Sequence, residues 1–248
     1  MYSPLEQFLI KPIFRIYNNW IDLTITNSTI YLIISISLIL MIFHISFNDT
    51  KLIKGRWGLL LEQSYIKIEE IAKEMIPGVY KKYIPFIITL FFFILTNNII
   101  GLVPYSFTTT AHFIITITMS LTIMLGVTIL GIVKHKFKFL KLFIPQGLDQ
   151  GLIKLIIPLI FFIEILSYLI RIISLSVRLT ANLMSGHTLL KIIANFGLKY
   201  TISFPILLVL PIGLISVIYL LEIGVAIIQA YVFTLLTATY IKDTELLH

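Results

Sequence analysis

The C-terminal part of the chain carries charged and polar side chains inside two long apolar runs. The first run, residues 152–196, contains Glu164, Arg171 and Arg178 at intervals of seven, so a helix would place all three on one face. Asn182 lies one turn beyond Arg178 on that face. An arginine at the centre of a bilayer costs about 2.5–3.5 kcal/mol on insertion scales. These residues are therefore expected to face protein or water and to have a function.

The second run, residues 203–242, carries Glu222 and Gln229 on one helical stripe and ends beside Asp243. Folding the two runs as an antiparallel hairpin about residue 204 brings three polar pairs to the same level: Arg178 with Gln229, His187 with Glu222, and Glu164 with Asp243. The sequence thus predicts a ladder of polar pairs along the hairpin.

These pairs suit proton transfer. His187 and Glu222 can exchange protons near neutral pH when they lie together. Arg178 cannot deprotonate, so it can attract a carboxylate and block a proton leak but cannot relay a proton. Arg171 could be a structural charge or a functional one.

Small side chains surround Arg178 and would let another helix approach closely: Ser174, Ser176, Ala181, Ser185 and Gly186. They fit either packing inside the hairpin or a surface past which a partner carboxylate slides. Because this chain supplies no spare acid at that depth, the sliding surface would require an acid from another subunit.

The composition places this hairpin in a membrane. Of 248 residues, 58% are hydrophobic and only 12% are charged, about half the charged share of soluble domains. The absence of cysteine excludes disulfides, thiolate metal sites and cysteine nucleophiles. The net charge of +7 lies in short loops between apolar runs, so it reflects membrane topology and predicts no nucleic-acid partner.

The remaining elements follow from run length. Three apolar runs have the roughly 20 residues of an ordinary span: residues 28–47, 83–103 and 110–133. In contrast, residues 56–75 alternate apolar and charged side chains with helical spacing, which predicts an amphipathic helix in the membrane interface.

The two C-terminal runs would extend roughly 68 and 60 Å as straight helices, far more than a perpendicular span needs. They predict a hairpin of two long tilted helices, with a turn at Asn195, Gly197 and Lys199. The expected fold is an all-α integral membrane protein: three ordinary spans, one interfacial helix and this hairpin.

Lysines set the expected orientation. They cluster between residues 51 and 82 and again in the loop 134–151, whereas no Lys or Arg lies between the second and third spans. By the positive-inside rule both clusters face the side of synthesis, and the N-terminal segment 1–27 faces away. The first 28 residues show no cleavable targeting pattern, which fits synthesis in a bacterium or inside an organelle.

Motif searches exclude other chemistry. There is no GxxxxGK[ST] loop, no HExxH helix and no nucleophile elbow, so we expect no enzyme activity, cofactor or metal in this chain. No internal repeat is evident, which disfavours an inverted-repeat transporter.

Three stretches resemble subunit a of F-type ATP synthases. They are Ser174-Leu-Ser-Val-Arg178-Leu-Thr-Ala-Asn182-Leu-Met-Ser-Gly-His187, Leu221-Glu-Ile-Gly-Val-Ala-Ile-Ile-Gln229-Ala-Tyr-Val-Phe-Thr-Leu-Leu-Thr-Ala and Asn98-Ile-Ile-Gly-Leu-Val-Pro-Tyr-Ser-Phe. With the N-terminal Ser3-Pro-Leu-Glu-Gln-Phe and the C-terminal Tyr240-Ile-Lys-Asp-Thr, the likeness covers nearly the whole chain. The order of His and Glu resembles mitochondrial members, and the chain ends resemble fungal ones.

The resemblance implies a proton-translocating stator subunit beside a rotating ring of c subunits. Arg178 matches the essential arginine that faces the ring carboxylates. The matches to the half-channel on the intermembrane-space side are His187, Glu222, Asn182, Gln229 and Asn98. Glu164 and Asp243 match the matrix-side half-channel.

The resemblance also implies partners and a location. The partners would be the c-ring, peripheral-stalk and other membrane-sector subunits, the lipid bilayer, protons and, in a dimeric assembly, a second ATP synthase. The chain would lie in the mitochondrial inner membrane, organelle-encoded, with its N-terminus in the intermembrane space and its C-terminus on the matrix side.

Two rival functions predict different behaviour. A self-contained secondary transporter that uses the Arg, Glu and His network would be active in liposomes without a ring partner. A structural membrane scaffold would tolerate neutral substitution of Arg178 and Glu222.

Overall fold

The structure is a computed structural model of the chain, and it describes residues 4–15, 17–18, 21–22, 24–48, 55–76, 78–103, 106–136, 157–201 and 209–246. Six α-helices account for most of these residues: α1 (Asn27–Asn48), α2 (Arg56–Met75), α3 (Tyr80–Leu102), α4 (Phe113–His135), α5 (Ile157–Thr201) and α6 (Val209–Leu246). All of them except α2 are long and apolar enough to cross a membrane. The prediction of a helical membrane protein is confirmed at this level.

The segment before α1 is not helical throughout. It holds a 3-10 helix and four short strands: η1 (Pro4–Phe8), β1 (Pro12–Phe14), β2 (Tyr17–Asn18), β3 (Ile21–Asp22) and β4 (Ile25–Thr26). The strands pair antiparallel, β1 with β4 and β2 with β3. The Asn27 side chain fixes the fold-back, because its amide donates to the Leu9 carbonyl (3.1 Å) and its oxygen accepts from the Lys11 N–H (3.2 Å).

Helix α2 has the bounds expected for the amphipathic helix, residues 56–75. Its inward face is centred on the buried Ile68 and Ala72, which contact the core. Leu61 also packs against the core, whereas the neighbouring Leu60 is exposed. The apolar surface of α2 is therefore wider than the face it buries.

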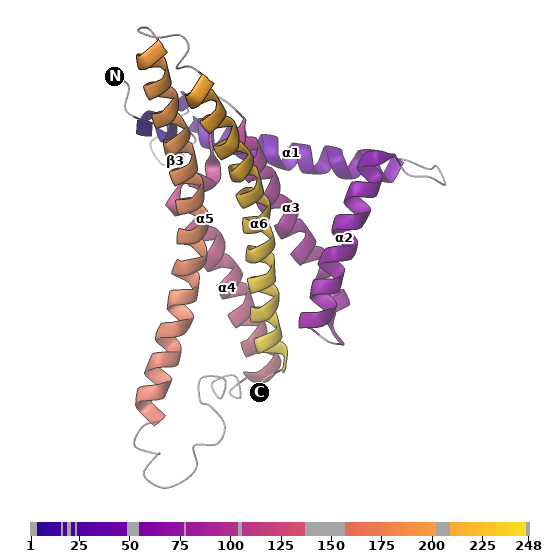
Figure 1. The fold of residues 1–248 in the computed structure, drawn as a ribbon. Coiled ribbons are helices and arrows are strands. Elements are labelled where there is room, and N and C mark those ends of the chain that lie inside the picture. The colour runs from indigo at the N-terminus through magenta and orange to yellow at the C-terminus, as the bar shows by residue number, and fades with distance from the viewer. Residues whose placement is uncertain are drawn as a thin grey trace.

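The arrangement is built around α5 and α6, which lie side by side as an antiparallel pair (Figure 1). Helix α3 packs on α6, α4 packs on both long helices, and α1 and α2 pack on α3. In Figure 1, α1 runs across the direction of α5 and α6. The long pair therefore lies at a large angle to α1.

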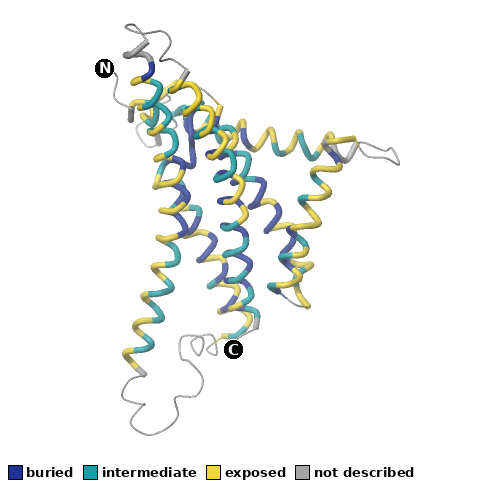
Figure 2. Tube along the Cα trace, in the orientation of Figure 1, coloured by how far each residue is buried: buried dark blue, intermediate teal, exposed yellow. Residues whose placement is uncertain are grey.

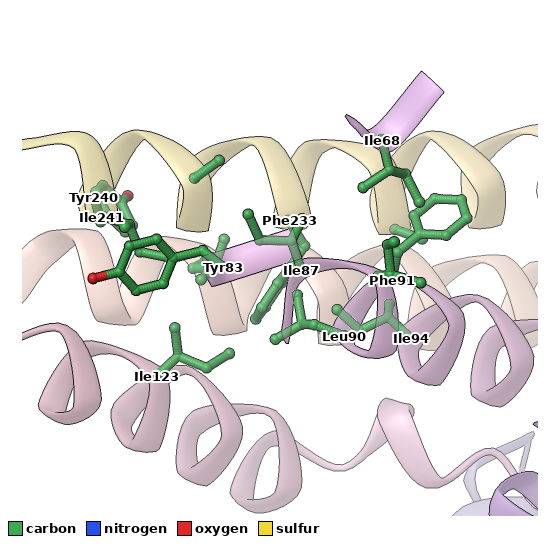
Figure 3. Close-up of a cluster of buried hydrophobic side chains, with 14 of the residues drawn as sticks. Ile68, Tyr83, Ile87, Leu90, Phe91, Ile94, Ile123, Phe233, Tyr240 and Ile241 are labelled. Atoms are coloured by element: carbon green, nitrogen blue, oxygen red, sulfur yellow. The ribbon is translucent and has the colours of Figure 1, made fainter. Parts of the chain in front are cut away.

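The apolar core lies between α3 and α6, with contributions from α2, α4 and α5. Figure 3 shows Ile87 of α3 near Phe233 of α6, and Phe91 of α3 near Ile68 of α2. Burial is concentrated on these inward faces, whereas much of α5 and the first half of α6 are exposed (Figure 2). Apolar side chains dominate those exposed faces, as expected where lipid or another subunit covers them.

One prediction about the hairpin is wrong. Asn195, Gly197 and Lys199 do not form the turn, because α5 continues through them to Thr201. Gly197 instead allows close approach of the two helices: a Cβ there would lie 3.1 Å from the Cβ of Pro211. The connection, residues 202–208, and residues 137–151 of the expected loop 134–151 lie outside the described residues.

Candidate functional site

The pair His187 and Glu222 joins the two long helices. His187 Nε2 lies 3.8 Å from Glu222 Oε1, as the hairpin register predicts. Glu222 is only 4% exposed, and within the described residues neither of its oxygens has a hydrogen-bond partner. A buried carboxyl without donors costs free energy, so its presence indicates a role other than stability.

Two neighbours shape this pair. Gly186 leaves the space that the Glu222 carboxyl occupies, since a Cβ at position 186 would lie 2.8 Å from Cδ of Glu222. From the N-terminal segment, the Phe8 ring meets the His187 ring edge-on, with centroids 6.4 Å apart. The start of the chain thus contributes to a site otherwise built from α5 and α6.

The next pair along the hairpin is Asn182 and Gln229. The Asn182 amide donates to Gln229 Oε1 at 3.1 Å, and Gln229 is buried. Gln229 was expected at the level of Arg178. Its partner in the structure is instead Asn182, one turn further along α5. Gln229 Nε2 has no hydrogen-bond partner among the described side chains.

Asn98 connects this region to α3. It is fully buried, its amide donates to the Ala226 carbonyl of α6 (3.4 Å), and its oxygen accepts from the Thr110 hydroxyl (3.0 Å). Asn97 accepts in the same way from Thr109 at 3.0 Å. Both threonines belong to η2 (Thr109–Ala111).

Sequence reasoning missed the partners of these asparagines. The available signal was the pair Asn97-Asn98 followed by the run of three threonines that ends with Thr109-Thr110. Asn97 and Thr109 are as far apart in sequence as Asn98 and Thr110. A further missed pair is Thr116 of α4 and Thr180 of α5, whose hydroxyls lie 2.6 Å apart.

Arg178 lies on the exposed face of α5, while the adjacent Leu179 is fully buried. In the described part of the chain, no ion pair links Arg178 to a carboxylate. The small residues around Arg178 were expected either to pack inside the hairpin or to form a surface past which a partner slides, and the structure places some of them in each position. Ser174, Ala181 and Ser185 are exposed with Arg178, whereas Ser176 is buried and Gly186 packs on Glu222.

At the other end of the hairpin, Arg171 meets Asp243. Arg171 Nη1 lies 3.8 Å from Asp243 Oδ2, and its guanidinium lies 5.7 Å from the centroid of the Tyr240 ring. The expected pair of Glu164 with Asp243 is therefore wrong, because Asp243 pairs with Arg171, two helical turns further along α5. Glu164 is partly exposed nearer the start of α5.

A second cluster ties the end of α6 to its neighbours. Glu245 accepts hydrogen bonds from the Tyr83 hydroxyl of α3 and from the Lys134 ammonium of α4. Lys134 also reaches the Glu245 carbonyl at 3.4 Å. Sequence reasoning missed Glu245, although it was the acid closest to the chain end.

The described residues offer no metal site, since no three His, Asp or Glu side chains among them come together to hold an ion. The site instead consists of acids, amides, one imidazole and two arginines. Such groups can bind, hold and pass protons.

Comparisons with known proteins place this chain among related sequences. Residues 29–242 match the family described as ATP synthase A chain. Proteins named ATP synthase subunit a are similar over their full length: that of Trichophyton rubrum is 43% identical (99% of this chain, 97% of the relative) and that of Mycosarcoma maydis 41% (100% and 98%). A third, from Chondrus crispus, is 40% identical (99% and 97%).

Proposed function

Because the chain belongs to the ATP synthase A chain family, we propose that α5 and α6 form the stationary surface beside which a ring of c subunits turns. Membership makes the chain the proton-translocating subunit of the ATP synthase membrane sector. It is a non-catalytic subunit, and nucleotide chemistry takes place elsewhere in the complex.

One observation carries the proposal: the exposed Arg178 lies between two separate polar pairs. His187 with Glu222 lies nine residues along α5 on one side, and Arg171 with Asp243 lies seven residues on the other. At 1.5 Å per residue these pairs are roughly 24 Å apart along the helix. Two half-channels that open beside these two pairs would be offset from each other along α5, as rotation of the ring requires.

Proton uptake is assigned to the His187 side. A proton passes through His187 and Glu222, with the amides of Asn182, Gln229 and Asn98 lining the way, to a carboxylate on the ring. The unpartnered Glu222 oxygens support this role, because they are free to accept a proton. Neutralising the ring carboxylate makes its passage through lipid much cheaper.

Proton release is assigned to the opposite side. After nearly a full rotation the ring carboxylate meets the region of Glu164 and Asp243 and gives up its proton. Arg171 offers Asp243 a counter-charge there. Arg178 then holds the bare carboxylate and, since it cannot deprotonate, separates the two half-channels. Each proton that crosses 100 mV delivers about 2.3 kcal/mol.

The proposed membrane arrangement has α1, α3 and α4 as ordinary spans, α2 in the interface, and α5 and α6 steeply tilted. The angle between α1 and the long pair supports the tilt (Figure 1), as does the length of α5, roughly 68 Å at 1.5 Å per residue. The location would be the mitochondrial inner membrane, with the N-terminus in the intermembrane space, the C-terminus on the matrix side, and the gene in the organelle.

The proposed partners follow from the exposed surface. The face with Arg178 would meet the c-ring, and the other apolar faces would meet lipid, peripheral-stalk and further membrane-sector subunits. Contact with a second ATP synthase in a dimer would use a surface away from the ring. A self-contained transporter is not supported, because the full-length relatives are named as a subunit of a complex.

The test is gentle solubilisation of native membranes, a native gel, and mass spectrometry of the band that holds this chain. Co-migration with a ring of small proteolipids and with ATP hydrolysis activity supports the stator function. Migration alone, together with solute transport by the isolated chain in liposomes, would overturn it.

A further inference from the structure

A groove opens between α3, α4 and α6 on a side of the molecule that the proton path does not use. Its volume is about 400 Å³, within the range of about 300–1,000 Å³ found for ligand sites. The floor is apolar and buried, formed by Tyr83 of α3, Ile123 and Val127 of α4, and Ile241 of α6. Figure 3 shows Tyr83, Ile123 and Ile241 around this space.

The edges of the groove are open to the surroundings of the protein. Phe86 of α3 is 45% exposed and Leu130 of α4 is 39% exposed. Between them lies Gly126, where a Cβ would have no heavy atom within 4 Å. In a chain whose spans face lipid, this groove therefore opens toward the acyl chains.

The groove is elongated. Its α4 wall runs from Thr122 to Leu130, roughly 12 Å at the helical rise. An apolar slot of this length that opens toward lipid suits an extended hydrocarbon chain.

One end of the groove is charged. Lys82 lies one turn from Phe86 on α3, Lys134 one turn from Leu130 on α4, and Glu245 one turn from Ile241 on α6. Lys134 is bound to Glu245, while the Lys82 ammonium lies 5.8 Å from the centroid of the Tyr83 ring. This end therefore carries two cations, Lys82 and Lys134, against one carboxylate.

We propose that this groove binds one anionic phospholipid, with an acyl chain along its apolar floor and its phosphate at Lys82. A basic end next to an apolar slot between membrane helices matches both parts of such a lipid. Lys134 does not neutralise the phosphate, because it is already paired with Glu245; instead it keeps that carboxylate away from the headgroup.

The first test is native mass spectrometry of the purified complex. The wild type should retain one anionic phospholipid per copy of this chain. Gly126→Leu places a side chain in the groove at a position where the Cβ has no heavy atom within 4 Å. It should reduce retention at least fivefold, and so should Lys82→Gln. Ile129→Phe, a bulky change on the exposed face of α4 outside the groove lining, should leave retention unchanged.

The second test covers the case in which Gly126→Leu prevents assembly. A photo-crosslinking amino acid at Phe86 of the intact complex should attach to an anionic phospholipid. Attachment to another polypeptide would overturn the proposal, because the groove would then be a subunit interface. A crosslinked lipid mixture that matches the bulk membrane, or equal retention in Gly126→Leu, would also overturn it.

Discussion

Glu222 occupies the space that any side chain at Gly186 would need. A Cβ at position 186 would lie 2.8 Å from Cδ and 3.2 Å from Cγ of Glu222, and Glu222 is itself buried against α5. Glycine at 186 is therefore a spatial requirement of the pair with His187, and the helical conformation there makes no demand for glycine.

Gly186→Ala should lower proton-driven ATP synthesis severalfold, because the added methyl pushes the Glu222 carboxyl away from His187. Synthesis by energised membranes, normalised to the amount of assembled complex, measures this. Gly213→Ala is the matched control, since a Cβ at Gly213 on the same helix as Glu222 has no neighbour within 4 Å. If both variants lost the same share of ATP synthesis, the loss would come from replacing a glycine within a helix and not from the contact with Glu222.

Glu222→Gln should slow proton flux through the membrane sector at least tenfold, because an amide fills the same space but cannot carry the proton. Proton-relay groups typically contribute about 10²–10⁴-fold to rates. Flux is measured as dissipation of a pH gradient through the sector after the nucleotide-hydrolysing part is removed. Glu69→Gln, on the surface of α2, should leave it unchanged. Unaltered flux in Glu222→Gln would remove this residue from the path.

Arg178→Ala should abolish coupled proton pumping while leaving the complex assembled, since the exposed guanidinium contributes little to packing within the chain. ATP-driven acidification of membrane vesicles measures coupling, and a native gel measures assembly. The matched control is Arg56→Ala, which removes an exposed arginine at the start of α2 and should leave pumping unchanged. Normal pumping by Arg178→Ala would contradict the assignment of the ring-facing residue.

Pattern reasoning recovered the elements set by periodicity and length. The bounds of α2 and the pair of His187 with Glu222 could be predicted, because helical spacing and an antiparallel hairpin determine them. The pair of Asp243 with Arg171 could not, since spacing alone does not reveal that the long arginine side chain reaches both Asp243 and the Tyr240 ring.

Long-range pairs between neutral residues also escaped prediction. Asn98 meets Thr110 and the Ala226 carbonyl only because α3 packs against α6, and nothing in the spacing of a single helix reveals which helix will be its neighbour. The fold-back that brings Phe8 to His187 depends in the same way on the hydrogen bonds of Asn27.

Glu245→Gln should loosen the end of α6, because it weakens two hydrogen bonds that reach α3 and α4. A hydrogen bond to a charged group contributes about 1.5–3 kcal/mol, reduced here because the Lys134 side chain is 45% exposed. Thermal inactivation of the purified complex should occur at a lower temperature. A double-mutant cycle with Lys134→Met should show coupling, and additive effects would contradict the cluster.

The segment around His112 should lose order as the pH falls. Burial lowers the pKa of His112 below its usual value, and its ring stacks on Phe107 with centroids 5.0 Å apart. The unfolded segment therefore binds more protons than the folded one, so stability decreases as the pH falls below about 6.5, the ordinary histidine pKa. Hydrogen exchange of residues 106–116 at several pH values tests this, and His112→Gln should remove the dependence.

The packing of α3 on α6 also bears on biosynthesis. Glu222 and Gln229 belong to α6, which leaves the ribosome after α3 and α5. Asn98, Asn182 and His187 gain their α6 partners only when that helix is in place. A nascent or truncated chain that ends before α6 would carry Arg178 but neither the pair of His187 with Glu222 nor the pair of Arg171 with Asp243. Such a chain would therefore be unable to conduct protons by this route before α6 is inserted.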